Sequence, residues 1–306
     1  MSRVKTWLPG LALITPSIIL VAVFVYGLIG QNVWTSLNAS TRRVVVGGQI
    51  VERAQHEGGI ANYVTLLSGA DYQHALWNLL VLTVVFMGGT MIFGLLWAVL
   101  LEKGVNGEGV FRSIYLFPMA VSFVAAGVVW RWLLSPAKGE GAIGLNQLLS
   151  KVGLDGLQSS WWSGDGRFTM AAMAMPAIWQ LSGYIMALFL AGFRGISDDQ
   201  REAARIDGAS EWQVYRHVLF PQLSPIALSA LIILGHMSMK MFDLIYAIAG
   251  PNSYAASVPA TLMWTQMFAQ DDRVAAAVNA TILLVIVAVV VVPYLIYTNK
   301  TESERD

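Results

Sequence analysis

The sequence predicts an all-α integral membrane protein with six transmembrane helices and a charged two-helix loop on the cytoplasmic side. Of its 306 residues, 56% are hydrophobic and only 12% are charged, whereas a soluble domain carries about 25% charged residues. The net charge is zero and cysteine is absent, so disulfides and thiolate metal sites are excluded and nothing indicates nucleic-acid binding. We expect no metal site, no catalytic site and no nucleic-acid partner.

Six apolar runs are long enough to cross a bilayer, which requires about 20 mostly apolar residues in a helix. These runs cover residues 8–28, 75–101, 113–134, 170–193, 226–248 and 274–297. We expect one transmembrane domain over residues 1–306, with an N-terminal span within 1–37 and a five-span core over 75–297. The first run is longer than the apolar part of a signal peptide and no small-residue cleavage site follows it, so it is predicted to be a span.

The distribution of lysine and arginine predicts that both termini are cytoplasmic. In this orientation the inside segments hold slightly more of these residues than the outside loops, and the outside loops are much longer. The first outside loop has β-branched runs around Gly47 and Gly48, a pattern typical of a short β-hairpin.

A charged insert at residues 197–221 separates two apolar runs and is predicted to form two short helices. Ser197-x-x-Gln200 and Ser210-x-x-Gln213 both fit the capping box that begins a helix. Gly208 lies between them, and glycine accepts the left-handed conformation that ends a helix. Pro221 either ends the second helix or marks the return to the membrane.

Three interpretations of this insert compete. It is an amphipathic hairpin on the bilayer surface, a DNA-binding helix-turn-helix, or a docking element for a cytoplasmic partner. Short tethers on both sides would hold a helix-turn-helix against the membrane, and the zero net charge disfavours DNA. Docking suits a rigid hairpin with both ends fixed, because force applied to it reaches both adjoining spans.

The insert resembles the EAA loop of ABC importer permeases, whose pattern is EAA-x3-G-x9-I-x-LP. Here Glu202-Ala203-Ala204 precedes Gly208 by three residues, and nine more residues lead to Val218-Leu219-Phe220-Pro221. Val218 and Phe220 replace the usual isoleucine and leucine and remain apolar. The stretches "GIANYVTLLS" at 59–68 and "MKMFDLIYAIAGPNS" at 239–253 are similar to the carbohydrate subfamily of these permeases.

The resemblance implies a sugar importer in a bacterial or archaeal cytoplasmic (inner) membrane. Its implied partners are a second permease in a heterodimer, a cytoplasmic ATP-binding subunit dimer, an extracytoplasmic solute-binding protein, the sugar and membrane lipid. The residues implied to couple to the ATPase are Glu202, Ala203, Ala204, Asp207, Gly208 and Pro221. A local alternative for Glu202 is a solvated pair with Arg205 at i,i+3.

The chain lacks the G-x-x-x-x-G-K-[ST] phosphate loop, so we expect it to be no enzyme and to carry no cofactor. ATP and magnesium would bind to the partner ATPase. An intramembrane hydrolase using Ser182 is a weaker alternative, because no glycine stands at position 180 to complete a G-x-S-G motif.

Polar residues inside the apolar runs are candidates for a substrate path, because charges are costly in a bilayer. In the fifth run His236, Lys240 and Asp243 would share one helix face. They form either an ion pair that fixes helix packing or a polar path, and a gradient-driven secondary transporter using these three groups is the alternative function. By position in the resembling family, the substrate-path candidates are Gln180, Tyr184, Ser238, Lys240, Met241 and Asp243.

Overall fold

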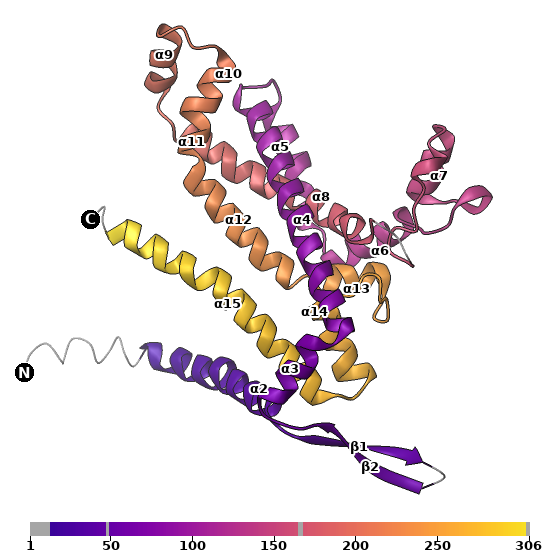
Figure 1. The fold of residues 1–306 in the computed structure, drawn as a ribbon. Helices are drawn as coiled ribbons and strands as arrows, with labels where there is room; N and C mark the ends of the chain where they lie inside the picture. Colours follow the sequence, from indigo (N-terminus) through magenta and orange to yellow (C-terminus); the bar gives the residue numbers. More distant parts are fainter. Residues whose placement is uncertain (1–12, 47–48, 165–167, 304–306) are drawn as a thin grey trace, which may run out of the picture. The chain divides into compact units, whose positions relative to one another are not determined.

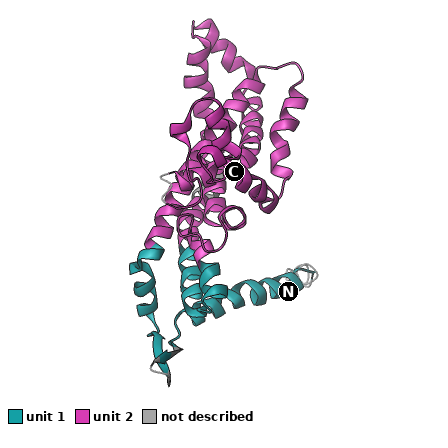
Figure 2. Cartoon of the chain, turned by 90° about the vertical axis from the view of Figure 1, so that its right-hand side faces the viewer, with its two compact units in different colours: residues 1–72, 263–285 teal, residues 73–262, 286–306 magenta. Residues whose placement is uncertain are grey.

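The computed structural model describes residues 13–46, 49–164 and 168–303, which are mostly helical and include one β-hairpin. The chain forms two compact units, Met1–Tyr72 with Met263–Val285 and Gln73–Leu262 with Ile286–Asp306 (Figure 2). The prediction of an all-α membrane protein is confirmed. Four helices are long and apolar enough to span a membrane, and two bent helix pairs bring the number to six.

The first unit begins with a helical span over Leu13–Ser36, which contains η1 (Ala22–Gly27) and α2 (Leu28–Ser36). Strands β1 (Ser40–Val46) and β2 (Gln49–His56) pair antiparallel, as predicted for the first outside loop (Figure 1). The predicted turn at Gly47-Gly48 and the predicted start of the first span at residues 8–12 lie outside the described residues. Helix α3 (Ile60–Ser68) follows the hairpin.

The base of this β-hairpin is tied to the start of helix α15 (Arg273–Ser303). The carboxylate of Asp272, directly before the helix, accepts a hydrogen bond from Gln55 Nε2 at 2.7 Å and lies 2.8 Å from His56 Nε2. It also accepts the backbone N–H of Ala275 at 2.9 Å, which satisfies a free donor of the first helical turn. One carboxylate therefore caps α15 and holds the end of β2.

The second unit packs around helix α8 (Thr169–Arg194), which matches the predicted run at 170–193. Two thirds of its most apolar window are buried, and its side chains Ile185, Met186, Phe189 and Phe193 are fully buried. The other elements that lie wholly or mostly in this unit are α4 (Ala70–Glu102), α5 (Glu108–Leu116), η2 (Phe117–Ala120), α6 (Phe123–Leu133), η3 (Gly139–Gly141), α7 (Gly144–Lys151), η4 (Asp155–Leu157), α12 (Ser224–Met239), α13 (Asp243–Ala249) and α14 (Pro259–Trp264). Helix η6 (Thr265–Ala269) belongs to the first unit.

Two predicted spans are not continuous helices. The run at 113–134 is broken between α5–η2 and α6, which differ in direction by 96°. The break follows Pro118, which lacks a backbone N–H and cannot continue the helical ladder. Gln180 Nε2 in α8 donates to the Val121 carbonyl in the break at 2.8 Å, so a side chain replaces the missing helical partner. The run at 226–248 is likewise interrupted after Met239 and resumes as α13 at Asp243.

The charged insert forms the predicted hairpin of α9 (Asp198–Ile206) and a second helical arm of α10 (Glu211–Val214), η5 (Tyr215–Leu219) and α11 (Phe220–Gln222). Gly208 has φ +83 between the arms, as predicted. The Ser210–Gln213 capping box is formed. The capping box predicted at Ser197 is wrong, because Gln200 Oε1 accepts a hydrogen bond from Gln222 Nε2 at 2.6 Å instead.

Candidate functional site

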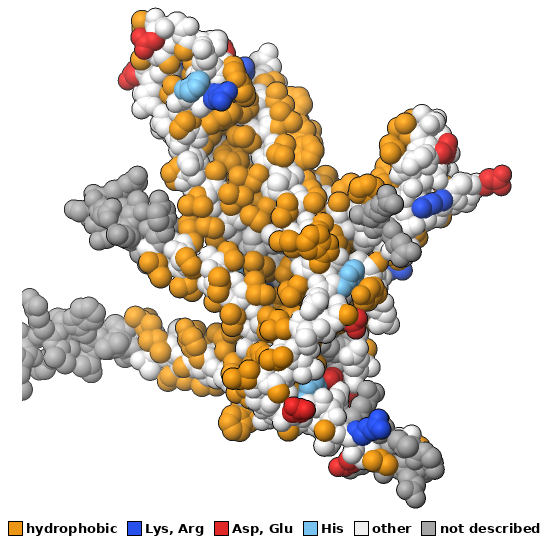
Figure 3. Space-filling view, viewed as in Figure 1, with side chains coloured by type: hydrophobic (Ala, Val, Ile, Leu, Met, Phe, Trp, Pro, Cys, Tyr) orange, Lys and Arg blue, Asp and Glu red, His pale blue; other side chains and the backbone are white. Residues whose placement is uncertain are grey.

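The two-helix hairpin of residues 198–222 has one exposed side and one buried side. Glu202 and Ala203 are exposed on α9. Around the bend, Ile206 is 86% exposed and Trp212 is 64% exposed. In Figure 3 this end of the second unit shows acidic, basic and apolar side chains close together. Large apolar groups beside charges, on a rigid turn, are typical of a protein-docking surface.

An ion pair closes the bend of the hairpin. Arg205 Nε in α9 donates to Glu211 Oε1 in α10 at 2.9 Å. This hydrogen bond lowers the pKa of the Glu211 carboxyl and raises the pKa of Arg205. Arg205 is thus hydrogen-bonded to Glu211, and Glu202 adds only a weaker coulombic effect on Arg205. The Glu202 carboxylate makes no hydrogen bond or ion pair with the residues that the structure describes, and it is exposed for a partner.

The buried side of the hairpin packs on the end of α8 through aromatic rings. Tyr215 in η5 lies edge-on to Phe193 at a centroid distance of 6.1 Å, and Phe220 lies 5.8 Å from Tyr215. Leu219 is 1% exposed between these elements. Burial of this face stabilises the hairpin against the helix bundle, so the hairpin is not an independent element on the bilayer surface.

Two of the predicted substrate-path residues lie on α8. Gln180 is 1% exposed, and its Oε1 has no hydrogen-bond partner among the described residues although its amide nitrogen is used at the α5–α6 break. Tyr184, one turn further along α8, is half-buried and packs against the core. A buried amide oxygen without a partner is costly, and in the described residues this one lies on α8 next to the α5–α6 break.

The other four candidates surround the interruption of the fifth run. Ser238 is buried and shares a 2.9 Å hydrogen bond with Thr83 of α4. Met241 is buried, whereas Lys240 and Asp243 are exposed. The prediction that Lys240 and Asp243 share one helix face is wrong, because the chain leaves the helix at residues 240–242. No ion pair joins Lys240 to Asp243 within the described ranges.

An interrupted helix has a physical meaning inside a membrane. Backbone N–H and C=O groups without helical partners are tolerated there only where protein buries them or where they line a polar cavity. Transporters use such breaks to contact solutes near the bilayer midplane. The break at residues 240–242 is therefore a better candidate for solute contact than a single helix face shared by His236, Lys240 and Asp243, which the sequence suggested.

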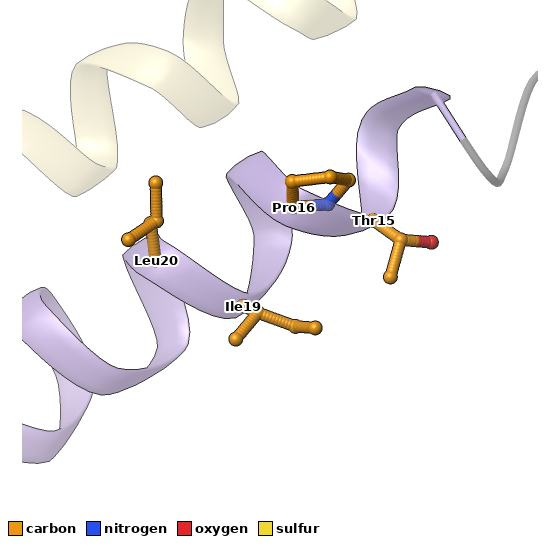
Figure 4. A pocket seen from close by; sticks show the side chains of 4 residues that line it. All are labelled: Thr15, Pro16, Ile19 and Leu20. Carbon is orange, nitrogen blue, oxygen red and sulfur yellow. The ribbon is translucent and has the colours of Figure 1, made fainter.

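The first span has a shallow hollow on its surface. Four residues line it: Thr15, Pro16, Ile19 and Leu20 (Figure 4). Three of the four side chains are apolar, and all belong to one helix. Such a surface suits contact with lipid chains or another apolar helix better than a polar solute. No group of acidic or histidine side chains suited to a metal occurs within the described part of the chain.

Comparison with known proteins agrees with this architecture. A family model described as "Binding-protein-dependent transport system inner membrane component" matches residues 90–298, more than half of the chain. A probable ABC transporter permease of Pyrococcus horikoshii is 37% identical over 290 residues, which cover 94% of each chain. The xylose/arabinose import permease of Haloferax volcanii is 35% identical over 242 residues, covering 78% of this chain and 74% of that one.

One solved structure shares the fold over nearly the whole chain. It is a bacterial alginate ABC transporter in complex with an alginate pentasaccharide-bound periplasmic protein. The match has a TM-score of 0.74 at 21% identity and covers 94% of this chain and 93% of that one.

Proposed function

Because the chain belongs to the family of binding-protein-dependent transport system inner membrane components, we propose that it is the membrane-spanning permease subunit of an ATP-driven sugar importer. The relatives named for sugars support this substrate class: one imports xylose or arabinose, and another, 26% identical over 254 residues, belongs to a trehalose/maltose transport system of Thermococcus litoralis. The chain forms half of the translocation path, and a second permease forms the other half.

The observation that carries the coupling role is the two-sided hairpin of residues 198–222. Its inner side is packed on α8, and its outer side presents the exposed carboxylate of Glu202 with Ile206 and Trp212. We propose that a cytoplasmic ATP-binding subunit seats on this outer side. That partner holds ATP and magnesium, and closure of its dimer pushes the hairpin and switches the spans between inward and outward access.

The structure gives each of the other proposed coupling residues a feature that suits its role in the hairpin. Ala203 and half-buried Ala204 have small side chains, so the backbone of a partner can approach α9 closely there. Asp207 and Gly208 form the bend, and φ +83 at Gly208 is a conformation that other residues adopt only with strain. Pro221 lies in α11, next to the 62° bend into α12. Both termini are cytoplasmic in this proposal, and a solute-binding protein delivers sugar from the opposite side.

The gradient-driven alternative finds less support. It requires Lys240, Asp243 and His236 to act as interacting charges on one face, and the helix is interrupted between them. Uptake should therefore require ATP and the cognate ATP-binding subunit in proteoliposomes. Xylose, arabinose, maltose and trehalose are the first sugars to test, and uptake by this chain alone would contradict the proposal.

We expect the double substitution Ile206→Ser and Trp212→Ser to weaken binding of the ATP-binding subunit by at least about tenfold. A tryptophan that becomes buried at the centre of an interface often contributes roughly 2 kcal/mol or more, and 1.4 kcal/mol corresponds to about a factor of ten. Binding is measured with the permease pair in nanodiscs. The matched control is Leu154→Ser with Leu157→Ser, two exposed apolar residues of the outer loop, which should leave this affinity unchanged.

Gln180→Met should raise the KM for sugar uptake by roughly tenfold or less while leaving ATPase binding unchanged. A hydrogen bond contributes about 0.5–1.5 kcal/mol, and methionine fills the volume without offering an amide oxygen. Because Gln180 also holds the Val121 carbonyl, thermal melting of the complex must be recorded alongside uptake. An unchanged KM combined with less folded protein would assign Gln180 to packing alone.

A further inference from the structure

Glu102, the last residue of α4, lies in a buried polar cluster beneath the hairpin. Its side chain is only 9% exposed. One carboxylate oxygen accepts a hydrogen bond from Arg201 Nη1, and the other accepts the hydroxyl of Tyr215 at 2.6 Å. Arg201 belongs to α9 and Tyr215 to η5. A single carboxylate therefore binds both arms of the hairpin.

The cluster also reaches the end of α8. Arg201 Nη2 donates to the backbone carbonyl of Phe193 at 3.0 Å, in the last turn of α8. Lys103 Nζ lies 5.6 Å from the centroid of the Tyr215 ring. The Arg201 side chain is 15% exposed, and its Nε lies 3.9 Å from Asp198 Oδ1. A charge this buried depends on its partners, so loss of Glu102 would affect all four segments.

Helix α4 has no direct covalent continuity with the hairpin. Glu102 is separated in sequence from Arg201 by 99 positions and from Tyr215 by 113. By contrast, α8 leads directly into α9, and α11 leads directly into α12. Movement of the hairpin reaches those two helices through the backbone, whereas α4 must be moved through side chains. In Figure 1 the α9–α10 end lies beside the end of α4, as these contacts require.

Helix α4 also contacts the proposed solute region. Its Thr83 shares the 2.9 Å hydrogen bond with Ser238, just before the break at residues 240–242. The same helix therefore carries a contact to the hairpin at its end and a contact to the interrupted span within its length. A helix with both contacts transmits displacement between the two places only if its connection to the hairpin is firm.

We infer that Glu102 is a positioning residue that makes α4 move together with the hairpin during transport. It touches neither sugar nor nucleotide, and it acts by clamping Arg201 and Tyr215. This inference rests on the proposed seating of the ATP-binding subunit on the hairpin. Its specific consequence is that loss of the Glu102 carboxylate separates ATP hydrolysis from sugar movement, with the ATP-binding subunit still bound.

The test is Glu102→Gln in the complete transporter, reconstituted in proteoliposomes with whichever of xylose, arabinose, maltose or trehalose the wild type accumulates. We expect the number of sugar molecules moved per ATP hydrolysed to fall between about twofold and thirtyfold, with ATPase binding unchanged. The matched control is Glu108→Gln, which removes the more exposed pair with Arg194 at the neighbouring α5–α8 contact. It should leave this ratio unchanged, and Glu102→Asp should restore part of the coupling.

A purely structural role would lower the amount of folded complex and leave the ratio of sugar to ATP unchanged, and that result would overturn the inference. Failure of the wild-type hairpin to bind the ATP-binding subunit would instead overturn the proposed function.

If Glu102→Gln assembles poorly, spin labels at Leu100→Cys and Arg216→Cys provide a second measurement, because the chain has no native cysteine. Both positions are exposed. The distance distribution between the labels should be narrow in the wild type and broader in Glu102→Gln, and equal widths would overturn the inference.

Discussion

Glu202→Lys should abolish ATP-driven sugar uptake while leaving sugar binding by the extracytoplasmic protein intact. The Glu202 carboxylate is exposed and makes no hydrogen bond or ion pair with Arg205, which pairs with Glu211. If basic groups of the ATP-binding subunit meet it, truncating a charged pair at that interface costs about 2–5 kcal/mol, and reversing its sign adds repulsion. A loss of affinity of roughly thirtyfold or more follows. The measurement is uptake in proteoliposomes together with binding of the ATP-binding subunit.

The matched control for this charge reversal is Glu140→Lys, which changes an exposed acid of η3 in the outer loop. It carries the same change of net charge and should leave uptake near the wild-type rate. Normal uptake by Glu202→Lys would contradict the docking role of α9. Loss of uptake in both variants would indicate a general effect of charge and would not support a docking contact.

Gly183→Val should prevent correct assembly of the helix bundle. A side-chain carbon at Gly183 in α8 would overlap the backbone carbonyl of Tyr115 in α5, and backbone atoms cannot move aside as a flexible side chain can. Overpacking of a core typically costs about 1–3 kcal/mol, and a collision with backbone falls at or above the upper end. We expect a large loss of folded, monodisperse protein in detergent, with Gly183→Ala showing a smaller loss in the same direction.

Gly88→Val is the matched control, because it makes the same glycine-to-valine change within another membrane helix. It therefore reports the effect of helix propensity and side-chain size without the collision. Gly88 also lies within a membrane helix, α4, but a side-chain carbon there meets no atom within 4 Å. The two glycines therefore differ in what surrounds them, and not in residue type or in the class of helix. Equal yields and melting temperatures for the two variants would contradict the close approach of α5 and α8.

Continuous apolar runs predicted the spans well where local chemistry alone decided the structure. The run at 170–193 became α8 (Thr169–Arg194), and Gly208 ended α9 as its freedom of conformation predicted. The interruptions near Pro118 and after Met239 were missed because an apolar run has the same composition whether its helix is straight or broken. A periodicity argument then placed Lys240 and Asp243 on one face of a helix that does not continue.

The site was predictable only in part. The EAA-like spacing identified the hairpin from the sequence, and the contacts inside it were not visible there. Glu102 attracted no attention because a single acid at the end of an apolar run is typical of a solvated helix end, and its partners are far away in sequence. Gln200 fitted a capping box by spacing, but its oxygen is used by Gln222 in the other arm. Tertiary contacts of this kind override local patterns.

The capping carboxylate at the start of α15 has a consequence for communication from the other side of the membrane. Asp272 holds the end of the β-hairpin through Gln55 and His56 while it caps the last span. In the proposed orientation, the β-hairpin faces the compartment from which sugar arrives. A protein that displaced these strands would therefore also displace the first turn of the last helix, through Asp272. In this proposal the chain receives force at two places, the hairpin of residues 198–222 and the β-hairpin. At each place an acidic side chain, Glu102 or Asp272, joins the hairpin to a spanning helix.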